Sequence, residues 1–154
     1  AFSFKAAKLG VNVTHVDSSK PANEWAKKNA QLNDISSIRW ITEDALKFLK
    51  KEEKRNKKYD GIIMDPPTFG RGAKGELFQI EKHLQPLLKT AFSLLDPKRA
   101  FLLFSCHTPG FTPLVVEQIL RQYGTGSFET KELFLGKCSE NQIPAGVACL
   151  YKTF

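Results

Sequence analysis

The sequence contains no long apolar run. No segment approaches the roughly 18 consecutive apolar residues that a membrane-spanning helix needs. The opening stretch AFSFKAAKLG also lacks the apolar core and cleavage site of a secretory signal peptide. Internal repeats, low-complexity tracts and interdomain linkers are absent from the 154 residues. These absences predict a single domain, residues 1–154, with no membrane partner.

Cysteines are few, and their spacing suits no structural role. The three of them, Cys106, Cys138 and Cys149, are an odd number without C-x-x-C spacing. Neither a disulfide framework nor a zinc site is therefore expected. The sequence predicts no metal, and a reducing cytoplasmic location fits it best.

Positive charge is in excess, with a formal net charge of +7 and a pI near 9.4. A basic surface favours a polyanionic partner such as RNA. The alternative is a lysine-coated surface that binds no nucleic acid. Much of the excess lies in KFLKKEEKRNKKYD, residues 47–60, where charges of both signs alternate as on a solvated helix end.

Short apolar segments alternate with longer segments of helical periodicity. The apolar segments, which we expect to be strands, lie at 11–16, 38–42, 60–65 and 100–106. The segments with helical periodicity lie at 21–33, 44–56, 76–95 and 111–124. Strands separated by helices at this spacing predict βαβ units and a parallel sheet. The last two apolar runs, 127–136 and 146–154, have no helix between them and predict an antiparallel hairpin.

Polar residues follow the first two predicted strands, where ligands bind in open α/β sheets. Asp17, followed by Ser18, offers two acceptors that suit the vicinal hydroxyls of a ribose, although these residues could instead only cap the next helix. Asp44 could accept from the exocyclic amine of an adenine, with the backbone of Ala45 nearby. The alternative for Asp44 is a plain N-cap, and both roles can coexist.

The third predicted strand ends in the most specific motif, IIMDPPTFGRGAKGE. Pro66 forces Asp65 into an extended conformation, and Pro67 stiffens the next step. The carboxylate and two fixed carbonyls form an array of acceptors for an amine or a cationic centre, beside a wall for a planar ring. The alternative is a rigid turn with no ligand.

The loop after this turn combines an aromatic residue, glycines and two cations. Phe69 could stack on a planar ring, while Arg71 and Lys74 could bind a phosphate. The glycines predict a mobile flap. The alternative is an ordinary solvated loop.

The fourth predicted strand ends in Ser105, Cys106 and His107. Cys106 could act as a nucleophile if its pKa is depressed, with His107 or a bound cation assisting. The alternative is an inert buried thiol, which is the usual state of a lone cysteine.

In the order of these strand-end motifs the chain resembles the class I S-adenosylmethionine-dependent methyltransferases. It is most similar to the branch that contains the bacterial large-subunit rRNA (cytosine-C5) methyltransferases and their uncharacterised relatives. The segments that carry the resemblance are VTHVDSSKPANEWAKKNAQLN, IRWITEDALKFL, YDGIIMDPPTFGRGAKGE and NQIPAGVA. Asp-Pro-Pro alone recurs in many base-modifying methyltransferases, whereas the ordered combination is far more specific.

The resemblance implies a Rossmann-like sheet, S-adenosylmethionine as the cofactor and an RNA base as the substrate. It implies that Asp17 holds the ribose hydroxyls of the methyl donor and that Asp44 and Ala45 contact its adenine. The segment from Asp65 to Pro67 would lie between the methionine end of the donor and the target. A cysteine at position 106 would attack C6 of cytosine, which activates C5 for methylation.

Two departures from the family pattern qualify these expectations. The first strand and glycine-rich loop of the family have no counterpart here, and AFSFKAAKLG is similar to the end of the helix that follows that loop. We therefore expect an N-terminally truncated fragment whose first two strands lack a neighbour joining them to the third. A complementary N-terminal segment or self-association would complete it. The run SCHTPG differs from the usual sequence after the rRNA-enzyme cysteine.

Three functions remain open from the sequence. The first is methylation of an RNA base, as in rRNA processing. The second is N-methylation of an exocyclic amine, for which Asp-Pro-Pro-aromatic loops serve without a cysteine. The third is a non-catalytic RNA-binding domain that keeps only the fold and binds through Arg71, Lys74 and the lysine-rich helix.

Overall fold

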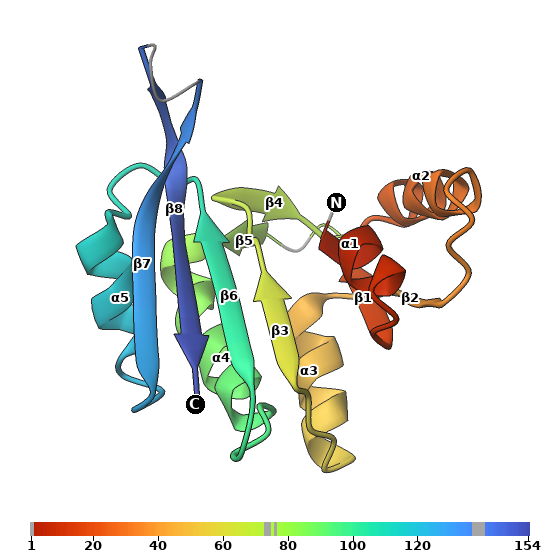
Figure 1. Ribbon diagram of the computed structural model, residues 1–154, viewed down its shortest axis with the longest axis horizontal. Helices are drawn as coiled ribbons and strands as arrows, with labels where there is room; N and C mark the ends of the chain where they lie inside the picture. The colour runs from red at the N-terminus through yellow and green to blue at the C-terminus, as the bar shows by residue number, and fades with distance from the viewer. Residues whose placement is uncertain (1, 73–74, 76, 137–140) are drawn as a thin grey trace.

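A computed structural model describes residues 2–72, 75, 77–136 and 141–154 of the chain (Figure 1). The helices are α1 (Phe2–Lys8), α2 (Lys20–Gln31), α3 (Ala45–Lys54), α4 (Ile80–Ser93) and α5 (Pro113–Leu120). The strands are β1 (Val13–Asp17), β2 (Ile38–Thr42), β3 (Gly61–Met64), β4 (Phe69–Arg71), β5 (Leu77–Gln79), β6 (Phe101–Cys106), β7 (Ser127–Leu135) and β8 (Ile143–Lys152).

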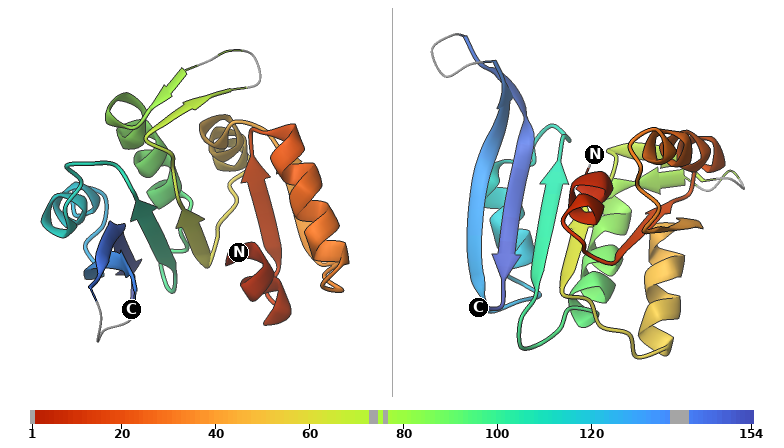
Figure 2. Two further views of the ribbon diagram at one scale, coloured as in Figure 1. Left: turned by 90° about the horizontal axis from the view of Figure 1, so that it is seen from above. Right: turned by 45° about the vertical axis from the view of Figure 1, so that its right-hand side comes forward.

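The strands form a Rossmann-like sheet that is broken in one place. β1 pairs in parallel with β2, and β3 pairs in parallel with β6. β8 then joins β6 to β7 through antiparallel pairings, giving the order β3-β6-β8-β7. Among the described strands none lies between β1 and β3 (Figure 2). The expected antiparallel hairpin and the expected break in the sheet are both confirmed.

Two apolar cores correspond to the two parts of the sheet. α4 and α5 lie on one face of the larger part, α3 packs against α4 on the side toward β1, and α1 lies on the opposite side (Figures 1 and 2). The larger core includes Leu88 of α4 and Leu102 and Phe104 of β6, all at most 1% exposed. The smaller core includes Ala7 of α1, Ala30 of α2 and Ile38 of β2.

α3 begins where the sequence predicts and joins the two parts. Asp44 caps it by accepting a hydrogen bond from the Lys47 amide at 2.8 Å. Its buried Glu52 accepts from the hydroxyl of Tyr59, just before β3, at 2.7 Å, and from Arg55 at 2.8 Å. Burial and this bond to Glu52 raise the pKa of Tyr59. The neutral phenol therefore fastens α3 to the start of β3 throughout the physiological pH range.

Two local predictions need correction. Residues 77–79 do not open the helix predicted at 76–95 but form β5, which pairs antiparallel with β4. Helix α4 begins only at Ile80, whose amide donates to the carbonyl of Thr68. The loop predicted as a mobile flap is thus bounded by the two strands of a short hairpin. The apolar spacing of this segment was compatible with both structures, and pairing with β4 decided between them.

No helix in the described part of the chain is long and apolar enough to cross a membrane.

The larger core makes a prediction about stability. Leu102 is fully buried in β6, whereas Leu114 of α5 is 67% exposed. We expect Leu102→Ala to lower the free energy of unfolding by about 2–5 kcal/mol because it leaves a cavity. The matched change Leu114→Ala should cost under about 0.5 kcal/mol. Urea denaturation measures both, and equal losses would contradict the assignment of β6 to the core.

Candidate active site

The carboxylate of Asp65 is the centre of the site. It follows β3 directly and is about half exposed, at 49% of its side chain. Because Met64 pairs with Phe104, Asp65 lies level with Ser105 on the neighbouring strand. The Ser105 hydroxyl donates to Oδ1 of Asp65 at 2.7 Å. The parallel strands therefore hold the carboxylate through Oδ1, while about half of the side chain stays exposed.

The turn after Asp65 is fastened to the end of β6. The hydroxyls of Thr68 and Thr108 lie 2.8 Å apart, within hydrogen-bond distance, and Thr108 is buried. Pro66 and Pro67 fix the backbone between Asp65 and this link. The turn is thus held at both ends, which restricts where the carboxylate can point.

His107, just after β6, also contacts Asp65. Its Nδ1 contacts the carbonyl oxygen of Ala145 in β8, and its Nε2 is 3.4 Å from Oδ1 of Asp65. The side chain is 57% exposed. Gly146 makes room for this ring, because a Cβ there would collide with the carbonyl of Cys106 and would lie 2.7 Å from Nδ1 of His107. Gly146 also has a φ of +111°, which favours glycine.

Cys106 points away from this cluster. Successive side chains of a strand alternate between faces, so Cys106 shares its face with Phe104 rather than with Ser105. Its thiol is fully buried in the larger core, where its sulfur accepts a hydrogen bond from the amide of Thr108 at 3.5 Å. This placement gives no support to attack on a substrate at Asp65, and the nucleophile role stays a prediction.

The predicted donor-binding residues lie at the ends of β1 and β2. Oδ1 of Asp17 accepts from the amide of Ser19 at 2.7 Å, and Ser19 rather than Asp17 caps α2. Ser18 lies between them, partly buried. In the described part of the chain no group donates to Oδ2 of Asp17, so this carboxylate keeps an acceptor available to a ligand.

A buried amide fixes the ends of these two strands. Nδ2 of Asn23, on α2, lies 3.1 Å from the carbonyl oxygens of Asp17 and Ile41 and 3.0 Å from the hydroxyl of Thr42. Asn23 is 1% exposed, and among the described residues its Oδ1 has no partner. Local sequence patterns offer little sign of this contact, because an asparagine in a first helical turn is usually exposed.

The other end of this region carries Asp44 and Ala45. Both are exposed at the start of α3, just after β2. Oδ1 of Asp44 caps the helix, so the predicted N-cap is confirmed. The pairing of Asp17 with Thr42 brings the ends of β1 and β2 together. Asp17 and Asp44 therefore lie at, or just after, the neighbouring ends of β1 and β2.

Two of the residues predicted to meet the substrate, Phe69 and Arg71, lie on β4 of the β4–β5 hairpin. Phe69 is 53% exposed at the start of β4, and Arg71 is exposed at its end. Lys74 lies outside the described residues. An exposed aromatic ring four residues after Asp65 is available for stacking on a flat ligand.

A cavity of about 400 Å³ borders His107. It lies between the loop that follows β6 and the start of β8, and its walls are largely apolar or glycine, with Phe111, Pro144 and Gly146 among them. Glu132 of β7 supplies a carboxylate. This cavity therefore opens beside the Asp65 cluster, at the carboxyl end of β6.

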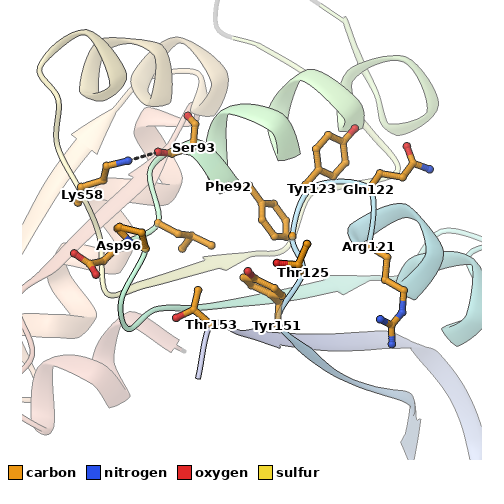
Figure 3. A pocket seen from close by; sticks show the side chains of 13 residues that line it. Lys58, Phe92, Ser93, Asp96, Arg121, Gln122, Tyr123, Thr125, Tyr151 and Thr153 are labelled. Atoms are coloured by element: carbon orange, nitrogen blue, oxygen red, sulfur yellow. Dashed lines mark hydrogen bonds between the residues drawn. The ribbon is translucent and has the colours of Figure 1, made fainter.

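A second cavity, of about 490 Å³, lies at the opposite ends of the strands (Figure 3). Lys58 and Asp96, which precede β3 and β6, line it together with Phe92, Tyr123 and Tyr151. Nζ of Lys58 already donates to the carbonyl of Ser93 at 2.6 Å. Ligands of open α/β sheets bind at the carboxyl ends of strands, so the chemistry belongs to the Asp65 end.

Among the described residues no group of His, Cys, Asp and Glu side chains is arranged to hold a metal ion.

The sequence predicts that Asp65 ends β3, but it does not predict the side-chain contacts that hold the carboxylate in position. Ser105 could have been found from strand pairing, since it is level with Asp65. The contacts of His107 with Ala145 and of Thr68 with Thr108 join residues 38 and 40 positions apart. No local pattern reports such contacts.

Comparison with known proteins places the chain among methyltransferases, although no protein-family model matches it. The rRNA large subunit methyltransferase I of Aeromonas salmonicida is 35% identical over 108 residues, which are 68% of this chain and 27% of that protein. The enzyme of the same name from Tolumonas auensis is 38% identical over 96 residues, 61% of this chain and 24% of that protein. The chain thus spans about a quarter of the length of these relatives.

Solved structures show the same fold. A SAM-dependent methyltransferase from Agrobacterium tumefaciens matches with a TM-score of 0.90 and 32% identity, over 97% of this chain and 51% of that one. A putative methyltransferase complexed with SAH matches with a TM-score of 0.75 and 19% identity, over 98% of this chain and 41% of that one. The predicted Rossmann-like methyltransferase fold is confirmed.

The placement of His107 makes a prediction about Gly146. We expect Gly146→Ala to lower the free energy of unfolding by more than the about 1–3 kcal/mol of a strained φ alone, because the new methyl group meets the backbone of β6. Gly110→Ala is the matched control, since Gly110 has a φ of +87° but nothing within 4 Å of a Cβ. Urea denaturation measures both, and equal losses would contradict the crowding.

Proposed function

We propose that the protein, a relative of the class I S-adenosylmethionine-dependent methyltransferases, transfers a methyl group from S-adenosylmethionine to a base of RNA. The observation that carries this is the exposed Asp65 carboxylate at the end of β3, followed by two prolines and an exposed aromatic ring. The names of the rRNA-methylating relatives support a ribosomal RNA substrate. In this proposal the chain forms one catalytic domain.

The ends of β1 and β2 fit the nucleoside half of the methyl donor. Asp17 keeps an acceptor for the ribose hydroxyls, with Ser18 beside it. Asp44 and the backbone of Ala45 are exposed beside Asp17 and offer acceptors and donors to an adenine edge. The donor supplies a methyl group on a positively charged sulfur, and the Asp65 carboxylate stabilises positive charge nearby.

The Asp65 turn and the β4–β5 hairpin fit the acceptor base. Pro66 and Pro67 form an inflexible wall, and Phe69 can stack on the face of a base. Arg71 and Lys74 would meet the phosphates of the RNA strand, and the net charge of +7 favours that approach. The cytoplasm is the location that this substrate implies.

A specific observation favours an exocyclic amine over a ring carbon as the target. Attack on C6 needs a thiolate that touches the base, yet Cys106 is fully buried on the face opposite Ser105. An amine needs no covalent adduct, because its own lone pair attacks the methyl group. The second candidate function is therefore N-methylation of a base amine at the same site.

A non-catalytic RNA-binding role would use only part of the site. It needs the basic residues but gives the acids at the ends of β1, β2 and β3 no function. Salt-sensitive RNA binding without donor binding would favour that role.

Donor binding tests the proposal directly. We expect Asp17→Asn to weaken S-adenosylhomocysteine binding by at least about tenfold, because an amide accepts only through one oxygen and a charge-assisted hydrogen bond is lost. Glu24→Gln, on the exposed side of α2, removes one charge as well and should leave affinity within about twofold. Isothermal titration calorimetry measures both. Absence of binding by the unaltered protein, in a form that includes the expected complementary N-terminal segment, would refute the proposal.

The two target atoms predict opposite behaviour of Cys106. If an amine is methylated, Cys106→Ala should retain methyl transfer from labelled S-adenosylmethionine to deproteinised large-subunit rRNA, apart from a loss of stability. If cytosine C5 is methylated, the variant should lose both activity and the covalent adduct with 5-fluorocytosine RNA. Mass spectrometry of digested product identifies the methylated nucleoside independently. A product methylated on carbon would rule out N-methylation of an exocyclic amine.

A further inference from the structure

The backbone carbonyl of Asp17 joins the ends of β1 and β2 to α2. Its oxygen accepts a hydrogen bond from the amide of Glu43 at 3.1 Å and another from Nδ2 of Asn23, also at 3.1 Å. Glu43 directly precedes Asp44 in the chain. One carbonyl therefore links the acid that the proposed function assigns to the ribose with the acid that it assigns to the adenine.

The surroundings of Asn23 fix the orientation of its side-chain amide. The carbonyl oxygens of Asp17 and Ile41 can only accept, so Nδ2 must be the atom that points toward them. Nδ2 carries two hydrogens, which suffice for both carbonyls, and the Thr42 hydroxyl lies 3.0 Å away. A single side chain therefore holds the last residue of β1 at a fixed separation from the last two residues of β2.

Asn23 is an unfavourable choice for a residue that serves packing alone. It is 1% exposed, and its Oδ1 has no partner within the described ranges of the chain. A buried acceptor without a donor lowers stability, whereas an apolar side chain of similar size brings no such acceptor into the core. Departures from good core chemistry are expected mainly at functional sites. The position of this amide therefore indicates a role beyond packing.

We propose that Asn23 is a positioning residue for the methyl donor. It sets the direction of the Asp17 carboxylate relative to Asp44, so that the protein binds the ribose hydroxyls and the adenine at the same time. Because its side chain is buried, Asn23 acts through Asp17 and does not touch the donor. This inference rests on the proposed function and assigns a part in it to a residue that lies behind the donor site.

The end of β1 needs such a support. In the described part of the chain β1 pairs only with β2, and this pairing stops at Asp17 and Thr42. Hydrogen bonds weaken steeply when their angles change, so a small rotation of this strand end would weaken the bonds of the carboxylate to two vicinal hydroxyls. Loss of the Asn23 amide should therefore remove the part of donor binding that depends on those hydroxyls. The alternative is that Asn23 only stabilises the fold, in which case all ligands are affected equally.

The test measures how strongly the protein prefers S-adenosylhomocysteine to an analogue that lacks both ribose hydroxyls. Isothermal titration calorimetry gives both affinities, with the protein in a form that includes the expected complementary N-terminal segment. We expect the unaltered protein to prefer the hydroxylated ligand by at least about tenfold, since hydrogen bonds to a charged group are strong. Asn23→Leu keeps the size of the side chain but cannot donate, and it should reduce this preference to about threefold or less.

Two further variants separate positioning from a general loss of stability. Thr90→Val is the matched control, because Thr90 is also buried and its hydroxyl also donates to a backbone carbonyl, that of Pro86. Thr90 lies in α4, on the larger part of the sheet, so the preference should stay within about twofold of the unaltered value. Asn23→Ser is too short to reach both carbonyls and should lower the preference as Asn23→Leu does. Urea denaturation shows which variants are folded.

A preference that falls in the Asn23 variants and is kept in Thr90→Val supports the inference. An unchanged preference in a folded Asn23 variant overturns it, even where both affinities fall together, and so does an equal fall in Thr90→Val. Failure of both Asn23 variants to fold assigns the residue to folding and overturns it as well.

The unaltered protein distinguishes failure of this inference from failure of the proposed function. If it binds S-adenosylhomocysteine but does not prefer it to the analogue, the contact of Asp17 with the ribose and this inference are both wrong, while the proposed function stands. If it does not bind S-adenosylhomocysteine at all, the proposed function is wrong and the inference falls with it.

Discussion

The parallel pairing of β3 with β6 places the carboxylate of Asp65 beside the hydroxyl of Ser105, and the other contacts of the site are arranged around that pair. A shift of one residue in this register would turn Asp65 toward the apolar core, because side chains alternate between the faces of a strand. The register is set by Met64 and Phe104, both buried beneath α4. Core packing therefore decides where the Asp65 carboxylate points.

The break in the sheet divides the proposed site into two parts that are positioned by different means. Asp65 is held by β6, by the Thr68–Thr108 link and by His107. Asp17 and Asp44 are held at the ends of β1 and β2 by the buried amide of Asn23 and by helix capping. The apolar packing of α3 and its Glu52–Tyr59 bond connect the parts. Donor binding would add a further connection between them, since the donor must contact both.

The two cysteines in the described part of the chain both point into the apolar core. Cys106 and Cys149 are both fully buried, and burial raises the pKa of the Cys149 thiol. Strand alternation explains why: each faces the core from a central strand of the larger sheet. Ser105 lies on the opposite, polar face of β6, and His107 follows just beyond the end of that strand. This edge of the larger sheet therefore carries hydrogen-bonding side chains, while both thiols lie in the core.

The sequence by itself determined the alternation of strands and helices, the cap at Asp44, the terminal hairpin and the stiff Asp65-Pro66-Pro67 turn. These features depend on residues close to one another in the chain, where periodicity, capping and proline geometry act. Only the tertiary structure decided that residues 77–79 form β5, that Cys106 faces the core and that His107 contacts Ala145 and Asp65. Each of these depends on strand register or on contacts between distant segments, which no local sequence pattern encodes.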